Sequence, residues 1–143
     1  SQCITGESFF SMRCDCRFQL TESLKQIAQN GRGVIFYLQQ EGRGIGLSNK
    51  IKAYSLQDKG LDTVEANHQL GFKDDERTYE NIAGMVKYLA IKKLDLMTNN
   101  PKKIKALEDM GIKVNQRVPI FSDTNKYNEK YISTKKSKLG HLI

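Results

Sequence analysis

The sequence lacks any apolar run that approaches the length of a membrane span, and its first residues do not form a secretory signal peptide. Without such a signal we expect the chain in the cytoplasm, a reducing compartment in which cysteines stay unpaired. Internal repeats, heptad arrays and signs of a second domain are also missing. At 143 residues the chain is long enough to bury a real core, so we predict a single domain over residues 1–143.

Acidic residues are scarce, because 16 Asp and Glu stand against 23 Lys and Arg and leave a net charge of +7. Such a balance favours an anionic partner, either a nucleic acid or a small polyphosphate. Charge alone does not choose between these two. The hydrophobic share of 38% is close to that of an average globular protein, so the composition predicts a folded domain.

Cysteine is absent after residue 16, and Cys3, Cys14 and Cys16 follow a C-x10-C-x-C spacing. Zinc favours thiolate ligands, and structural zinc sites close with four protein ligands. Three thiolates without an obvious fourth ligand predict instead an open position for water, as in catalytic zinc sites. The spacing also allows three reduced thiols, or one disulfide with a leftover thiol.

Apolar segments alternate between strand-like and helix-like patterns along the chain. This alternation predicts an α/β fold with a mostly parallel sheet and helices on both faces. Residues 60–78 are polar and irregular, and we expect a loop there. The expected strands are 34–38, 94–97 and 112–118, and the helices expected by range are 18–30, 101–110 and 131–139. Two further helices are expected, one with Leu47, Ile51 and Tyr54 on one face and one with Ile82, Met85 and Leu89 aligned.

Two loops follow predicted strands and are candidate anion sites. The glycine-rich turn at 41–46 leads into a helix, an arrangement that presents backbone N–H groups to phosphate, although a plain tight turn explains it equally well. In the second loop, Asn100 suits a helix N-cap and Pro101 the first helical position, with two lysines beside them. Because ligands collect at the carboxyl ends of parallel strands, we expect these loops to converge.

A set of motifs along the whole chain, in order, resembles GTP cyclohydrolase II, an enzyme family of riboflavin biosynthesis. The set is specific, although each motif alone is not. The motifs are Cys3-Ile-Thr-Gly, Arg13-Cys-Asp-Cys, Gln40-Glu-Gly-Arg-Gly-Ile-Gly-Leu, Asp62-Thr-Val-Glu-Ala-Asn-His-Gln-Leu-Gly-Phe, Asp75-Glu-Arg, Leu96-Met-Thr-Asn-Asn-Pro-Lys-Lys and Lys138-Leu-Gly-His-Leu.

The resemblance implies a three-layer α/β fold, usually in a homodimer, and a role for each matching residue. The cysteines match zinc ligands, Asp75 a proton acceptor, Arg77 a proposed nucleophile and Tyr54 a catalytic tyrosine. Because a guanidinium is effectively never deprotonated, a clamp on the phosphates is an equally plausible role for Arg77. The positions that match GTP contacts are Ser1, Gln19, Glu41, Gly42, Arg43, Thr63, Thr98 and Lys103.

Such enzymes convert GTP to formate, pyrophosphate and a diaminopyrimidinone ribosylamino phosphate. Zinc would supply hydroxide at C8 of guanine, and magnesium would accompany the triphosphate. Three thiolates overcompensate the charge of the zinc ion, and Arg13 or Arg17 is expected to offset part of this excess. The implied partner is GTP, with no nucleic acid or membrane.

Two features depart from the family pattern. Arg17 stands where the family commonly has glycine, and an added cation there is expected to alter the electrostatics of the metal or phosphates. Ser1 matches the end of a family segment, which implies that the N-terminal part of the typical domain is absent. The alternatives are a zinc-stabilised module that binds nucleic acid, and an inactive dimerisation remnant of a bifunctional riboflavin enzyme.

Overall fold

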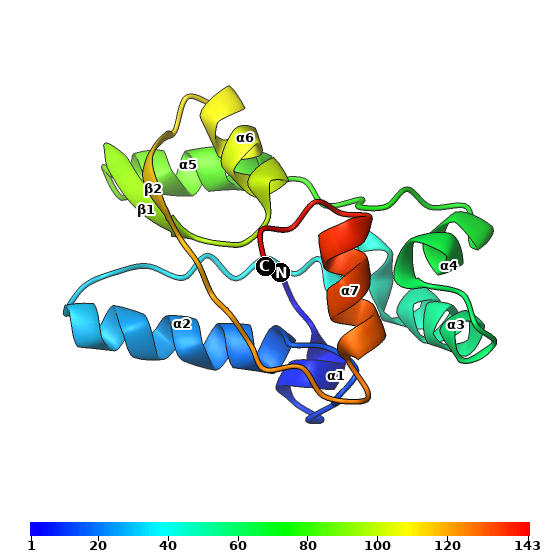
Figure 1. The fold of residues 1–143 in the computed structure, drawn as a ribbon. Helices are drawn as coiled ribbons and strands as arrows, with labels where there is room; N and C mark the ends of the chain where they lie inside the picture. Colours follow the sequence, from blue (N-terminus) through cyan, green and yellow to red (C-terminus); the bar gives the residue numbers. More distant parts are fainter.

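A computed structural model describes residues 1–143 and shows a mixed α/β protein with parallel strands (Figure 1). None of its helices combines the length and the apolar character that crossing a membrane requires. In chain order the elements are α1 (Ile4–Glu7), α2 (Cys16–Asn30), the 3-10 helix η1 (Glu41–Gly44), α3 (Gly46–Asp58), α4 (Thr63–Gln69), α5 (Glu80–Tyr88), β1 (Lys93–Met97), α6 (Pro101–Asp109), β2 (Lys113–Val118) and α7 (Glu129–Ser137).

The β1-α6-β2 unit confirms the predicted strands and the helix between them. The two strands pair in parallel, from Lys93 opposite Lys113 to Met97 opposite Val118. As predicted, α6 begins at Pro101, and the side chain of Asn100 accepts a hydrogen bond from the Lys102 N–H at 3.0 Å. The apolar core lies where this unit meets α5, and its buried members are Ile82, Val86, Leu107 and Ile112.

The predicted strand at 34–38 is wrong, because this segment is extended but belongs to no sheet. Its carbonyl of Leu38 accepts a hydrogen bond from the Gln2 N–H at 2.8 Å, while Val34 and Tyr37 remain about half exposed. An apolar run forms a strand only when a neighbouring strand satisfies its backbone groups. The sheet therefore has two strands, and the three-layer, mostly parallel sheet expected from the sequence is not confirmed.

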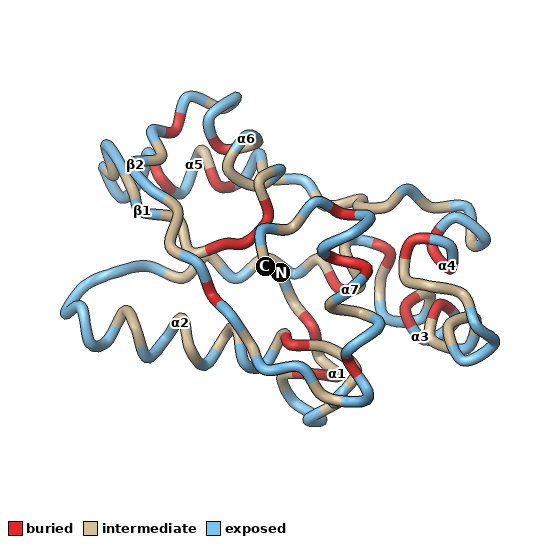
Figure 2. Tube along the Cα trace, viewed as in Figure 1, coloured by how far each residue is buried: buried red, intermediate tan, exposed pale blue.

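Helix α2 confirms the predicted helix and extends it to Cys16 at its N-terminal end. Gly31 ends the helix in the left-handed conformation, with φ of 79°. None of its residues is buried, and Figure 2 shows the helix in tan and pale blue from end to end. The N-terminal turn of α2 carries Cys16 and Gln19, and residues along the rest of the helix line the cavity described below.

Helices α3 and α4 differ from the predictions in instructive ways. The helix predicted around Leu47, Ile51 and Tyr54 is confirmed as α3, but Leu47 and Ile51 are exposed and the buried residues are Lys50 and Ala53. Part of the expected loop at 60–78 is the helix α4, which a capping box between Asp62 and Glu65 begins. The D-x-x-E pattern in the sequence is the signal that predicts this start.

Helix α7 ties distant parts of the chain together and lies two residues earlier than predicted at each end. Lys138, just after the helix, forms ion pairs with Asp62 and Glu65 at the start of α4. Within α7, Lys135 reaches Asp15 with an Nζ–Oδ1 distance of 2.6 Å. The C-terminal helix therefore fixes the cysteine segment relative to α4.

Candidate functional site

The three cysteines come together where α1 meets the start of α2. The Cys3 and Cys14 sulfurs lie 3.7 Å apart, and the ligand atoms of Cys3, Cys14 and Cys16 all lie within 4.8 Å of one another. All three are free thiols, and Cys3 is buried. Gly6 allows this close approach, because a Cβ there would lie 2.9 Å from the Cys14 sulfur.

This geometry fits a thiolate-bound metal. Two sulfurs on one tetrahedral zinc, each at about 2.3 Å, lie roughly 3.8 Å apart. Hydrogen bonds from Cys14 and Cys16, together with the Lys50 ammonium, hold the pKa of the Cys3 thiol far below its usual value although burial opposes this. The site therefore already favours one thiolate, and Cys3, Cys14 and Cys16 are the residues that could hold zinc.

Lys50 is the cation nearest these sulfurs, and the sequence analysis missed it. Its Nζ donates hydrogen bonds to the Cys3 sulfur at 3.0 Å, to Thr5 Oγ1 at 2.8 Å and to Glu41 Oε1 at 2.8 Å. Burial alone would lower the pKa of Lys50, but the hydrogen bonds to Cys3 and Glu41 outweigh it and raise this pKa. Its signal in the sequence is its position four residues before Tyr54, on the same face of α3.

The two arginines predicted to offset the thiolate charge are engaged elsewhere. Arg13 pairs with Asp58 at 2.7 Å and lies 5.0 Å from the centre of the Tyr54 ring. Arg17 stacks on Phe10 at 3.6 Å. Neither forms a hydrogen bond with a cysteine sulfur, so the expectation that they neutralise the site is not supported.

Asp15, between Cys14 and Cys16, anchors the cysteine segment from behind. Its carboxylate accepts hydrogen bonds from Lys135 Nζ and from Gln19 Nε2, each at 2.6 Å. Burial would raise the pKa of Asp15, but the Lys135 ammonium overrides it and leaves the pKa below the usual value. A buried ion pair with full hydrogen bonding fixes geometry at little net gain in stability, so its role is to hold the two flanking thiols in place.

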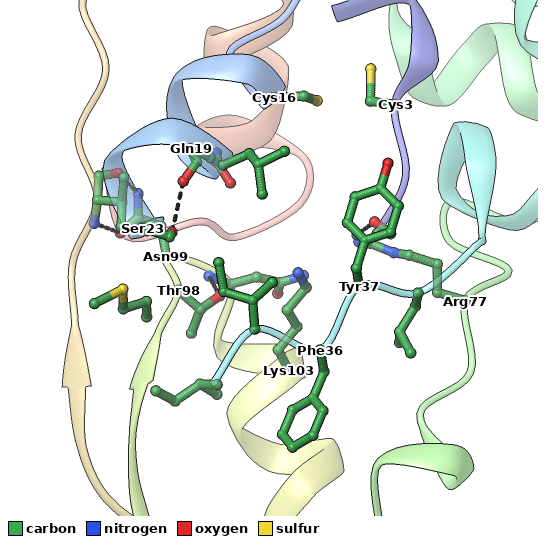
Figure 3. A pocket seen from close by; sticks show the side chains of 18 of the residues that line it. Cys3, Cys16, Gln19, Ser23, Phe36, Tyr37, Arg77, Thr98, Asn99 and Lys103 are labelled. Carbon is green, nitrogen blue, oxygen red and sulfur yellow. Dashed lines mark hydrogen bonds between the residues drawn. The ribbon is translucent and has the colours of Figure 1, made fainter. Parts of the chain in front are cut away.

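Several cations of the site have no anionic partner. Arg43, in η1, buries its Nη1 without any hydrogen bond. Lys103, in the first turn of α6, extends into the same cavity (Figure 3), and burial together with nearby Arg77 lowers its pKa to about 8. Because a buried donor without a partner costs about 1–3 kcal/mol, the Arg43 Nη1 indicates a ligand that satisfies it. Each of the two loops therefore contributes a cation to the same cavity.

Asp75 and Arg77 form a two-contact ion pair. Arg77 Nε donates to Asp75 Oδ1 at 2.8 Å, and Arg77 Nη2 donates to Asp75 Oδ2. In addition, Arg77 Nη1 donates to the Ser1 hydroxyl at 3.0 Å. Although burial opposes it, the Arg77 guanidinium lowers the pKa of Asp75. Gly44 brings this segment against the glycine turn, because a Cβ there would lie 2.9 Å from the Glu76 carbonyl carbon.

The loop after β1 is buried and rigidly held. Thr98 Oγ1 accepts the Asn100 N–H at 3.0 Å, and the Asn99 carbonyl accepts the Leu142 N–H at 2.8 Å. This second contact brings His141 into the cavity wall, where burial and then Lys135 lower its pKa to about 4. Asn99 and His141 are cavity residues that the sequence analysis did not assign, although both lie inside its motifs.

One cavity of about 1480 Å³ unites these groups and continues between α2 and the extended segment at 33–40. Figure 3 shows Cys3, Cys16, Gln19, Arg77 and Lys103 around it. Asp75 is the one predicted site residue that does not line this cavity. The predicted residues that do line it are Ser1, Cys3, Cys14, Cys16, Gln19, Glu41, Gly42, Arg43, Tyr54, Thr63, Arg77, Thr98 and Lys103.

Three thiols close enough to bind one metal ion, in a cavity that also holds an unpaired cation, are typical of metal-dependent enzymes that act on anionic substrates. The family model of GTP cyclohydrolase II matches residues 1–119. The chain therefore belongs to the GTP cyclohydrolase II family, and it is an enzyme of this type.

Proteins that are named GTP cyclohydrolase-2 align with the chain over all of its 143 residues. The protein from Campylobacter hominis is 60% identical, and the alignment covers 72% of its length. Those from Shewanella amazonensis and Azotobacter vinelandii are both 57% identical, with 70% and 69% of their lengths covered. Identity at this level supports the resemblance on which the site residues were predicted.

Proposed function

We propose that this protein is a zinc-dependent hydrolase that opens the imidazole ring of GTP in the first step of riboflavin biosynthesis. The products are formate, pyrophosphate and 2,5-diamino-6-(5-phosphoribosylamino)pyrimidin-4-one. The observation that carries the proposal is the shared cavity, which is lined by the three thiols, by Arg43 with its unpaired Nη1 and by Lys103. Names of relatives at 54–60% identity support GTP as the substrate.

Cys3, Cys14 and Cys16 would hold the zinc ion. When bound, zinc supplies hydroxide near neutral pH, the nucleophile that attack at C8 of guanine requires. The protein's own contribution is to fix the thiols: Asp15 restrains Cys14 and Cys16 from behind, and Lys50 restrains Cys3.

The triphosphate would bind where positive charge lacks a partner. Arg43 and Lys103 would donate charge-assisted hydrogen bonds to it, joined by Arg77 once this side chain turns from Asp75. Magnesium would neutralise part of the charge of the phosphates. The other proposed GTP contacts surround this position in the same cavity; they are Ser1, Gln19, Glu41, Gly42, Thr63 and Thr98.

Tyr54, Asp75 and Arg77 would divide the remaining chemistry. Tyr54 lines the cavity beside the cysteines and would orient water or polarise the formyl intermediate. The ion pair with Arg77 lowers the pKa of Asp75, and this makes the Asp75 carboxylate a weaker base. Asp75 would therefore accept a proton only after Arg77 turns toward the phosphates. We propose that Arg77 clamps the leaving phosphates and does not attack phosphorus, because its guanidinium stays protonated.

The decisive experiment measures zinc content together with formate and pyrophosphate release from GTP. Zinc-loaded protein should release both products, and a chelator should abolish formate release. Tight binding of mixed RNA without formate release would instead favour a nucleic-acid module, and folded, zinc-free protein without either activity would favour an inactive remnant. The family resemblance also motivates a homodimer, and sedimentation that shows only monomer would contradict it.

A further inference from the structure

We propose that Lys50 is a positioning residue that balances the charge of the three-thiolate site and fixes Cys3 for metal binding. This inference rests on the metal assignment in the proposed function and adds to it a residue outside the ligand set. Lys50 lies on α3, which contributes no cysteine, so it joins the metal loop to a second element.

The surroundings of Lys50 satisfy every proton of its ammonium. The three acceptors, at 2.8–3.0 Å, are the Cys3 sulfur, the Thr5 hydroxyl and Glu41 Oε1. The side chain is only 10% exposed. Burying an ammonium is expensive unless it is paired and hydrogen-bonded, so a lysine retained here points to a need for its charge.

Glu41 holds Lys50 in this position from the opposite side. Its Oε1 also accepts the Gly42 N–H at 2.9 Å, and its Oε2 accepts the Ile4 N–H at 2.7 Å, next to Cys3. The carboxylate therefore connects the glycine turn, α1 and Lys50 in one network. Both ends of this network are fixed to backbone, so the ammonium is aimed at the sulfur and not free to swing away.

The charge of the ligand set explains why such a cation is useful. Three thiolates carry one negative charge more than a zinc ion neutralises, and excess donor charge makes a zinc-bound water less acidic. A hydrogen bond from an ammonium to a thiolate withdraws part of that charge, as outer-shell partners of metal ligands generally do. Lys50 therefore acts on the metal through Cys3 without contacting it.

The other nearby cations give no hydrogen bond to a cysteine sulfur. Arg13 pairs with Asp58 and Arg17 stacks on Phe10, whereas Lys135 pairs with the Asp15 carboxylate. Among the hydrogen bonds to a cysteine sulfur, the one from Lys50 is the only one given by a charged group. Although its ammonium also pairs with Glu41, Lys50 is therefore the cation that acts directly on a sulfur of the site.

The test replaces zinc by cobalt and reads the thiolate-to-cobalt charge-transfer band. Lys50→Met removes the charge and the hydrogen bonds but keeps the length of the side chain. A more electron-rich sulfur gives up charge more easily, so the band should move to longer wavelength. We also expect formate release to fall by about 10–100-fold, the usual effect of losing an outer-shell partner. Lys52→Met, an exposed lysine of the same helix, is the matched control and should leave the band unchanged.

Lys50→Gln keeps N–H donors for Thr5 and Glu41 but removes the charge. If Lys50→Met does not fold, the position of the cobalt band is measured in Lys50→Gln instead. Circular dichroism establishes which variants are folded. A cobalt band at the wild-type position in a folded Lys50 variant would overturn the proposal while leaving the proposed function intact. Wild-type protein that gives no thiolate–cobalt band would overturn both. Loss of the fold in both Lys50 variants would also overturn the proposal, because Lys50 would then be a structural residue.

Discussion

At the scale of single residues, the site is a cavity whose cations fall into two groups. Beside the cysteines, Lys50 and Lys135 form ion pairs with Glu41 and Asp15. Arg43 Nη1, in contrast, is buried without a hydrogen-bond partner. A ligand that carries both a ring to be opened and a polyphosphate has one group for the thiols and another for the unpaired cation, and the residue-scale predictions follow from this.

Arg43→Ala should weaken GTP binding far more than guanosine binding. The substitution removes a charge-assisted contact to phosphate of about 1.5–3 kcal/mol, and guanosine has no phosphate to lose. Calorimetry on both ligands measures the difference, with Lys52→Ala as a control for the loss of one positive charge. Equal losses for the two ligands would contradict the phosphate role of Arg43.

The affinity for GTP should fall as the pH rises through about 8, because burial and Arg77 lower the pKa of Lys103 to that value. Below this pH Lys103 is an ammonium that attracts phosphate, and above it the free protein must take up a proton to bind. Lys103→Arg stays charged and should bind GTP with little dependence on pH in this range. Calorimetry on either side of pH 8 tests this, and an unchanged slope in the variant would show that another group titrates.

Tyr54→Phe and Arg77→Ala should affect different products. Loss of the Tyr54 hydroxyl should slow deformylation and let a formylated intermediate accumulate, whereas loss of Arg77 should reduce pyrophosphate release. Quantifying formate and pyrophosphate separately in each variant distinguishes the two roles. Proportional losses of both products would show that the roles are not separable, and wild-type rates would remove both residues from the chemistry.

At the scale of elements, short helices are positioned mainly by their ends. The capping box places the start of α4, and Lys138 from the end of α7 pairs with both of its carboxylates, Asp62 and Glu65. Thr63, a proposed GTP contact, is the first residue of this helix. The cap thus fixes a cavity residue as well as the helix.

Asp62→Ala should lower the free energy of unfolding by about 0.5–2 kcal/mol, the usual cost of losing an N-cap. Denaturant unfolding measures this. Asp74→Ala is the matched control, since Asp74 pairs with the exposed His68 and caps no helix. A loss in Asp62→Ala no larger than in the control would show that α4 does not depend on its cap.

At the scale of the whole molecule, the packing is unevenly distributed. Only 22 of 143 residues are buried, and one group of them lies between α5 and the β1-α6-β2 unit. The cysteine segment is joined to the rest by polar contacts, which contribute little net stability. Metal binding is therefore expected to contribute measurably to the stability of the folded cysteine segment.

Removing zinc with a chelator should lower the thermal midpoint of the wild-type protein. A ligand that binds only the folded state adds about 3 kcal/mol when its free concentration is a hundredfold above its dissociation constant. Cys14→Ser should retain most of the fold, lose zinc and ring opening, and show no response to the chelator. Full zinc occupancy in that variant, measured by metal analysis, would contradict the assignment of the ligands.

Local signals in the sequence were sufficient to predict features that depend on residues close together in the chain. Asn100 and Pro101 predict the start of α6, and Gly31 predicts the end of α2. The cysteine spacing likewise predicts the thiol cluster. Each depends on residues close together in the chain, whose chemistry does not need a distant partner.

Tertiary structure alone decided the features that depend on a distant partner. The segment at 34–38 has the pattern of a strand but no neighbouring strand, so its backbone cannot complete a ladder. Lysine is normally a surface residue. Lys50 is buried because Cys3, Thr5 and Glu41, from two other elements, provide acceptors for its ammonium group. The periodicity of apolar residues predicts which side chains are buried from their hydrophobicity alone. It cannot predict a buried lysine, because the free energy of burying a charge depends on the groups that surround it.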